Sequence, residues 1–199
     1  MKRKTGRGGR RARDADRRPK IDARGLASGA RFIPSPNCDD RPPGEAVRLI
    51  VIHNISLPPG EFGGDDIARL FCNTLDCSAH PYYDGLRDLR VSAHFLVRRW
   101  GEIVQFVQCT RRAWHAGEST WRGRTCCNDF SIGIELEGAD AVPYADAQYA
   151  ALAALTAALM RAYPVEEVLG HADIAPGRKT DPGSAFDWPR FRTLLSRAA

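Results

Sequence analysis

Two histidines and one aspartate, far apart in the sequence, form the strongest candidate for a chemical site. His53 directly follows the apolar residues 49–52, and a strand end is where a rigid scaffold presents a side chain to a cleft. His171 and Asp181 lie in a segment that Gly and Pro interrupt repeatedly, which predicts a loop. Two imidazoles and one carboxylate are a ligand set for catalytic zinc, with a fourth position left for water. Spacing alone leaves open that His53 is only a packed histidine and that the loop is only a solvated turn.

Further candidates for acid–base and electrostatic roles lie near these residues in the sequence. Residues 131–137 alternate between apolar and polar side chains, which predicts a strand whose polar face carries both Glu135 and Glu137. Either carboxylate could take a proton from an attacking water. Lys179, two residues before Asp181, is a cation that could meet the negative charge growing on an attacked carbonyl oxygen.

A β-sheet is predicted to position these side chains. Its strands are expected at residues 47–52, 91–98, 103–107 and 131–137, where apolar and β-branched residues dominate. The short Trp100-Gly101-Glu102 segment predicts a hairpin between the second and third of these strands. Residues 25–44 contain four prolines, so we expect an irregular arm there.

Helices are predicted to cover this sheet. Asp65 or Asp66 can cap a short helix, and a last helix should begin near Asp187. Asp146 can cap the longest helix, at about residues 147–163, in which leucines at helical spacing predict a core-facing stripe: Leu152, Leu155 and Leu159. The expected fold class is therefore mixed α/β, a central mixed β-sheet flanked by helices.

Composition indicates one globular domain. The 199 residues suit a single core, and no apolar run is long enough to span a bilayer. The net charge of +5 is due to residues 1–20, because the remaining chain carries more acid than base. No apolar core of a secretory signal follows these residues. We expect residues 1–24 to be a basic, disordered extension and residues 25–199 the domain, located in the cytoplasm. Nucleic-acid binding by the extension is the less favoured alternative, because no aromatic residue lies among these charges.

The six cysteines include no Cys-x-x-Cys pair, so a cysteine-rich zinc site is not expected. Free thiols are the expectation for a chain without an export signal. A thiol hydrolase using Cys126 or Cys127 is an alternative function, although the sequence indicates no partner histidine.

Five separated blocks of this chain resemble, in the family's order, the cytoplasmic 1,6-anhydro-N-acetylmuramyl-L-alanine amidases (the AmpD family). The blocks are VIHNISLPPGEFGG at 51–64, LRVSAHFLVRRWGEIVQFV at 89–107, RAWHAG ending at Gly117, CNDFSIGIELEG at 127–138 and GHADIAPGRKTDPGSAFDW at 170–188. The resemblance begins at about Asp22 and implies the amidase-2 or peptidoglycan-recognition fold.

The resemblance also implies roles for individual residues. It implies that His53, His171 and Asp181 bind zinc, that Glu135 is the catalytic proton acceptor, and that Lys179 stabilises the transition state. The implied reaction is hydrolysis of the amide bond between anhydro-N-acetylmuramic acid and L-alanine of a small muropeptide, in cell-wall recycling. A non-catalytic peptidoglycan-binding module of the same fold is the alternative.

Substrate contacts are expected at three further positions. Asn54 could hydrogen-bond substrate amides, Arg90 could engage a carboxylate, and His115 is either a substrate contact or a packed residue. His94 is expected to pack or to support a ligand, and Asp173 to stabilise its loop.

One departure from the family pattern concerns the stem peptide. The family often has Arg before "CND", where this chain has Cys126. Either Arg122 or Arg124 could take over that role, or the stem-peptide preference differs.

We expect a monomer with no nucleic-acid or membrane partner.

Overall fold

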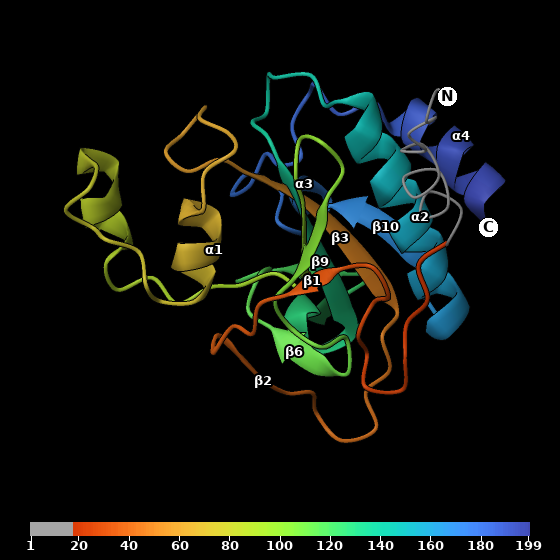
Figure 1. Cartoon of the computed structure of the whole chain (residues 1–199). Helices are drawn as coiled ribbons and strands as arrows, with labels where there is room; N and C mark the ends of the chain where they lie inside the picture. Colours follow the sequence, from red (N-terminus) through yellow and green to blue (C-terminus); the bar gives the residue numbers. More distant parts are fainter. Residues whose placement is uncertain (1–17) are drawn as a thin grey trace, which may run out of the picture.

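Two seven-residue strands, β3 (Leu49–Ile55) and β9 (Ser131–Glu137), pair in parallel at the centre of the sheet. The computed structural model describes residues 18–199, and its main sheet has the strand order β1-β5-β4-β9-β3-β10. In that sheet β4 (Phe95–Val97) is parallel to β9, β10 (Glu167–Gly170) is parallel to β3, and β5 (Ile103–Gln105) is antiparallel to β4. The expected central mixed sheet is confirmed (Figure 1).

Further short strands lie at the edge of the main sheet and in two small two-stranded sheets. β1 (Arg31–Phe32) pairs with β5, β2 (Cys38–Asp40) pairs with β6 (Arg111–Ala113), and β7 (Thr120–Trp121) pairs with β8 (Arg124–Thr125). The expectation that residues 25–44 form no regular element is therefore wrong. The prolines in this arm keep the strands short, because proline has no N–H to donate, but they leave other residues free to pair at an edge.

The two faces of the central strands pack against different partners. Ile50 and Ile52 of β3 and Ile132 and Ile134 of β9 contact the core beneath α2 (Asp146–Ala162). Successive side chains of a strand point to opposite faces, and the intervening residues of β3 join a separate cluster. His53 and Glu135 therefore project from the face opposite α2.

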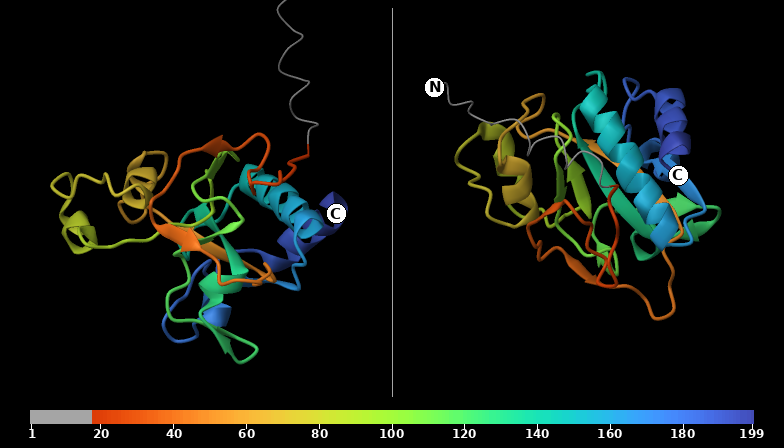
Figure 2. Two further views of the ribbon diagram at one scale, coloured as in Figure 1. Left: turned by 90° about the horizontal axis from the view of Figure 1, so that it is seen from below. Right: turned by 45° about the vertical axis from the view of Figure 1, so that its right-hand side comes forward.

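Helices lie on both sides of the sheet. α2 and α4 (Trp188–Ala198) cover one face, whereas α1 (Asp66–Phe71) and the 3-10 segment η1 (Pro81–Leu86) pack on the other, as Figures 1 and 2 show. The remaining short elements are the 3-10 segment η2 (Cys127–Phe130) and α3 (His171–Ile174).

The long helix follows the sequence expectation except at its start. The leucine stripe is fully buried, at Leu152, Leu155 and Leu159. Asp146 does not cap the helix, since it lies in the first turn and Ala145 precedes it. The side-chain oxygen of Gln148 accepts the Ala145 N–H instead. The expected start of the last helix near Asp187 is confirmed, and Asp187 Oδ1 caps α4 by accepting the Arg190 N–H at 2.9 Å.

Strand boundaries differ from the expected ones. β3 begins at Leu49 and continues past His53 to Ile55, because its backbone pairs with β9 along its whole length. The strand expected at 91–98 is shortened to β4.

Residues 1–17 of the expected basic extension lie outside the described residues. All six cysteines are within the described part, and none is in a disulfide. No helix among residues 18–199 is long and apolar enough to cross a membrane.

The buried stripe of α2 gives a test of the packing. Leu152 is fully buried, whereas Met160 of the same helix is 43% exposed. We expect Leu152→Ala to lower the free energy of unfolding by about 2–5 kcal/mol, because it removes buried methyl groups and leaves a cavity. Met160→Ala should change it by less than about 0.5 kcal/mol. Urea unfolding measures both values, and equal effects would contradict this packing.

Candidate metal centre and cleft

Strand register brings the two histidines together. Ile52 of β3 pairs with Gly170 of the parallel strand β10. The residues that follow, His53 in β3 and His171 directly after β10, therefore lie at the same level. His171 is the first residue of α3, directly after β10, and not part of a loop as expected from the sequence. Asp181 comes from the segment that follows α3. The expected set is thus gathered at the carboxyl ends of parallel strands, where α/β sheets commonly bind ligands.

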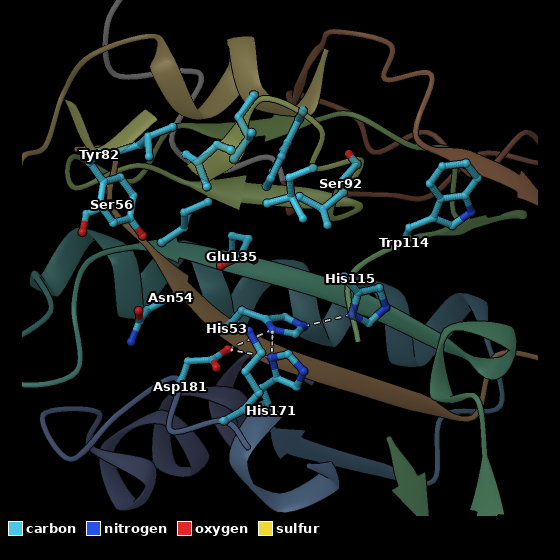
Figure 3. Close-up of a pocket in the computed structure, with 18 residues that line it drawn as sticks. His53, Asn54, Ser56, Tyr82, Ser92, Trp114, His115, Glu135, His171 and Asp181 are labelled. Atoms are coloured by element: carbon cyan, nitrogen blue, oxygen red, sulfur yellow. Dashed lines mark hydrogen bonds and ion pairs between the residues drawn. The ribbon is translucent and has the colours of Figure 1, made fainter. Parts of the chain in front are cut away.

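Three side-chain atoms converge at this point (Figure 3). His53 Nδ1 lies 3.0 Å from His171 Nδ1 and 3.0 Å from Asp181 Oδ2, and the last two atoms are 3.1 Å apart. Zinc–nitrogen and zinc–oxygen bonds of about 2.0–2.2 Å require tetrahedral ligand atoms about 3.3 Å apart. The observed triangle is within a few tenths of an ångström of that spacing, so its size fits zinc.

The far nitrogens of both rings are already engaged. His171 Nε2 lies 2.9 Å from the carbonyl oxygen of Ala116, which can only accept, so this nitrogen donates. His53 Nε2 lies 2.9 Å from His115 Nδ1. In neutral rings that donate through Nε2, the Nδ1 lone pairs point at each other and at the Asp181 carboxylate. A cation stabilises three converging lone pairs, so the donor set also fits a metal.

The electrostatics of the ligands favour the forms that bind metal. Burial lowers the pKa of His53 to about 4, although its contact with Asp181 opposes this shift. Burial raises the pKa of Asp181, but its contacts with His171 and His53 outweigh it and place that pKa below its usual range. At neutral pH His53 is therefore neutral and Asp181 is ionised, as metal ligands must be.

Glu135 lies beside His53 on the neighbouring strand, at the register pair that joins β3 and β9. It is 9% exposed and lines the cleft, and its Oε2 has no hydrogen-bond partner among the described residues. Burial, then the negative charge of Asp181, raises the pKa of Glu135 well above its usual value, while Lys179 opposes the shift. A buried carboxylate without a partner, facing a cleft, is suited to accept a proton.

Glu137 is not available for that role. Its Oε1 accepts from Arg98 Nη1 at 3.0 Å and from the Gly63 N–H at 2.7 Å, and its Oε2 accepts from the Arg99 N–H at 3.0 Å. Glu137 is fully buried in this network. Geometry therefore separates two glutamates that share one strand face.

The cleft above the triangle has a volume of about 300 Å³. Its polar floor contains the candidate metal ligands His53, His171 and Asp181, together with Glu135 and Lys179. Much of its wall is apolar or aromatic, from Ile55, Leu57, Leu70, Phe71, Tyr82, Leu86, Leu89, Val91 and Trp114. A ligand with both polar and apolar parts would fit such a lining.

The three residues expected to contact substrate lie around this cleft. Asn54 lines it, and its Nδ2 donates to Asp140 Oδ1 at 2.7 Å. Arg90 lies in an adjoining hollow of about 300 Å³, where it donates to the carbonyl oxygens of Arg87 and Leu89. His115 lines both spaces. Substrate contact by these residues stays a prediction.

Other expected residues have identifiable partners. His94 is fully buried, accepts the Gly133 N–H through Nδ1 at 3.1 Å and contacts Arg111 O through Nε2 at 3.1 Å. It packs as expected. Asp173 lies in α3 and not in a loop as expected, and its Oδ2 accepts the Gly170 N–H at 2.7 Å, which stabilises the start of that helix.

The structure does not favour Arg122 or Arg124 as a replacement for the family's arginine. Arg122 pairs with Glu166 at 3.0 Å and Arg124 pairs with Glu45 at 2.8 Å. Neither arginine lines the cleft, because both are held by carboxylates on the outer surface.

Two residues that hold the site were missed in the sequence. Arg41 is largely buried and donates to carbonyl oxygens of residues 128, 129 and 131. Asn128 binds the backbone of His115 and Ala116. Arg41 lies in the proline-rich arm and gave no signal, whereas Asn128 belongs to the block CNDFSIGIELEG.

Comparisons with known proteins agree on one family. Residues 43–184 match the family model described as N-acetylmuramoyl-L-alanine amidase. The 1,6-anhydro-N-acetylmuramyl-L-alanine amidase AmpD of Escherichia coli is 59% identical over 175 residues, which cover 87% of this chain and 96% of the relative. The protein of the same name from Haemophilus influenzae is 48% identical over 171 residues, covering 84% and 93%.

Solved structures agree with these relatives. A crystal structure of a selenomethionine AmpD derivative superposes with a TM-score of 0.85 at 59% identity, covering 86% of this chain and 97% of that one. The amidase AmiD from E. coli, in complex with its substrate anhydro-N-acetylmuramic acid-L-Ala-D-γ-Glu-L-Lys, gives 0.55 at 33% identity, covering 74% and 57%.

Buried His94 predicts how stability depends on pH. Burial, then the charge of Arg41, lowers the pKa of His94 from 6.5 to about 3. Between these values the unfolded chain binds more protons, so the free energy of unfolding falls as pH drops from 6.5 toward 3. His94→Asn keeps an acceptor for the Gly133 N–H but removes the titrating ring. As the pH falls through this window, the free energy of unfolding of the wild type should decrease relative to that of His94→Asn by up to about 1.4 kcal/mol per pH unit.

Urea unfolding in the presence of a chelator measures this difference. Parallel profiles for the wild type and His94→Asn would show that His94 is not held neutral in the folded state.

Proposed function

The chain belongs to the N-acetylmuramoyl-L-alanine amidases, and within them to the 1,6-anhydro-N-acetylmuramyl-L-alanine amidases, and we propose that it uses a zinc ion held by His53, His171 and Asp181. As an enzyme of this family it hydrolyses the amide bond between the lactyl group of anhydro-N-acetylmuramic acid and L-alanine. The observation that carries the zinc proposal is the convergence of two Nδ1 atoms and one carboxylate oxygen within 3.1 Å of one another.

The protein's own residues divide the proposed reaction between them. A zinc ion at such a site would supply Lewis acidity, which lowers the pKa of water and so makes it a stronger nucleophile toward an amide at neutral pH. Glu135 accepts a proton from the attacking water and passes it to the nitrogen of the leaving L-alanine. Its raised pKa suits this double role, because the carboxyl group must both take and release a proton.

Lys179 is proposed to stabilise the negative charge that develops on the attacked carbonyl oxygen. It lines the same cleft as Glu135, and its charge acts on the pKa of both Glu135 and His53. Loss of a comparable electrostatic donor raises a barrier by about 2.7–4 kcal/mol. Asn54, held by Asp140, presents its amide to the cleft and is proposed to bind a substrate amide group.

The proposed substrate is a small anhydro-muropeptide. The cleft combines a polar floor with apolar walls, and the related AmiD has been solved with an anhydro-muramyl tripeptide. Arg90, in the adjoining hollow, is proposed to meet a carboxylate of the stem peptide, and His115 to line the path. The proposed setting is cell-wall recycling in the cytoplasm by a monomer that needs no nucleic acid or membrane.

The alternative functions have less support. A non-catalytic binding module would not need Glu135 aimed at an intact donor triad. A thiol hydrolase would need a reactive cysteine at the cleft, but Cys126 and Cys127 do not line it. Burial also raises the pKa of Cys127, which disfavours its thiolate.

Two substitutions test the zinc and proton-acceptor roles separately. Asp181→Ala should lose bound zinc and activity, because it removes one of three ligands. Glu135→Gln should keep zinc but lose turnover by about 10²–10⁴-fold, since the amide cannot accept the proton. Elemental analysis gives the zinc content, and mass spectrometry of the products from an anhydro-muropeptide gives the turnover.

Glu61→Gln is the matched control, because Glu61 is exposed and its replacement should change neither the zinc content nor the turnover. Wild-type protein that stays zinc-free and inactive after zinc addition would refute the proposal. Normal turnover by Glu135→Gln would refute the proton-acceptor role alone.

The proposed substrate size can be tested directly. We expect much faster release of peptide from soluble anhydro-muropeptides than from intact murein, because the cleft is small. Product chromatography with both substrates at equal peptide concentration measures the ratio. Equal rates would contradict a recycling role.

A further inference from the structure

Two consecutive residues provide the outer hydrogen bonds of both histidine ligands. His115 Nδ1 lies 2.9 Å from His53 Nε2 (Figure 3). The carbonyl oxygen of Ala116 accepts from His171 Nε2 at 2.9 Å. The rings of His53 and His171 therefore both depend on the placement of one short backbone segment.

Asn128 fixes that segment. Its Oδ1 accepts the His115 N–H at 3.1 Å and the Ala116 N–H at 2.8 Å. Arg41 in turn holds the backbone around Asn128, through the carbonyl oxygens of Asn128 at 3.1 Å and Ser131 at 2.8 Å. A single side-chain oxygen thus positions the acceptors of both ligands.

The ring of His115 has little freedom to turn. Its Nε2 lies 3.1 Å from Ser131 Oγ, and its face packs on Gly133 so closely that a Cβ there would be 2.5 Å from the His115 Cγ. The two ring nitrogens have different partners, His53 for Nδ1 and Ser131 for Nε2, and a neutral imidazole has one donor and one acceptor nitrogen to offer them.

The position of the ring proton decides whether His53 can bind a metal. If His115 donates through Nε2 to Ser131, its Nδ1 accepts the Nε2–H of His53. The Nδ1 lone pair of His53 then points into the donor triangle. The opposite tautomer of His115 would place two N–H groups face to face or force the His53 proton into the triangle.

We propose that His115 and Asn128 are positioning residues that set the tautomer and orientation of His53 and His171, and thereby strengthen zinc binding. The inference rests on the zinc site proposed above. Outer hydrogen-bond partners of metal ligands typically contribute 10–100-fold to metal affinity.

Paired variants of His115 separate this role from simple packing. Asn places its Oδ1 where His115 has Nδ1, so His115→Asn keeps the acceptor for His53. Gln reaches toward Ser131 instead, and Phe keeps only the ring shape. We expect zinc affinity, measured by competition with a chelator of known affinity, to fall about 10–100-fold in His115→Gln and His115→Phe. His115→Asn should stay within about threefold of the wild type.

Asn128 offers a second pair. Asn128→Asp keeps an oxygen that can accept both N–H groups, whereas Asn128→Leu has a similar size and no acceptor. The Leu variant should lose about 10–100-fold in zinc affinity and the Asp variant much less. Circular dichroism of the metal-free variants identifies any that do not fold, and the conclusion then rests on the folded pair.

The outcomes distinguish the two proposals. Wild-type protein that binds no zinc would overturn the zinc site itself. Wild-type protein that binds zinc, with unchanged affinity in the Gln, Phe and Leu variants, would overturn only this inference. An unchanged zinc affinity with a raised KM in His115→Phe would likewise overturn it and assign His115 to substrate contact.

Discussion

The parallel register of β10, β3 and β9 is the constraint on which the site depends. It pairs Gly170 with Ile52 and His53 with Glu135, so that two imidazoles and a carboxylate leave neighbouring strands at one level. Backbone hydrogen bonds set this register, and a slip of one residue would turn His53 toward the core beneath α2. The positions of His53, His171 and Glu135 are therefore set by the strand pairing at the centre of the sheet.

The hydrogen-bond partners of each buried carboxylate then determine whether it can exchange protons. Two glutamates two residues apart on β9 have the same chemistry and face, but Glu137 is engaged by Arg98 and backbone N–H groups, while Glu135 keeps an oxygen without a partner among the described residues. A paired buried carboxylate stabilises structure, whereas an unpaired one has a raised pKa and can exchange protons. The surroundings, and not the residue type, separate the structural glutamate from the proposed catalytic one.

The sequence pattern predicts the elements of the fold better than the partners of individual side chains. Periodicity predicted β9 and the leucine stripe of α2, because each reports burial of one face. It could not choose between Glu135 and Glu137, since their partners come from distant segments. Residues 167–174 were assigned to no strand or helix, because β10 and α3 are too short for a clear period. Arg41 carried no signal at all, as its partners are backbone carbonyl oxygens that no side-chain pattern encodes.

Arg41 also explains why an irregular arm belongs to the site. A buried guanidinium needs acceptors, and Arg41 finds them in the carbonyl oxygens of Cys109, Asp129 and Ser131 instead of in a carboxylate. These bonds tie the arm to the segment that leads into β9, so the backbone carrying Asn128 is held from outside the sheet. The sheet sets the level of His53, His171 and Glu135, and the arm holds the segment whose groups contact both histidines. The packing of the arm and the geometry of the candidate metal centre are therefore linked through Arg41.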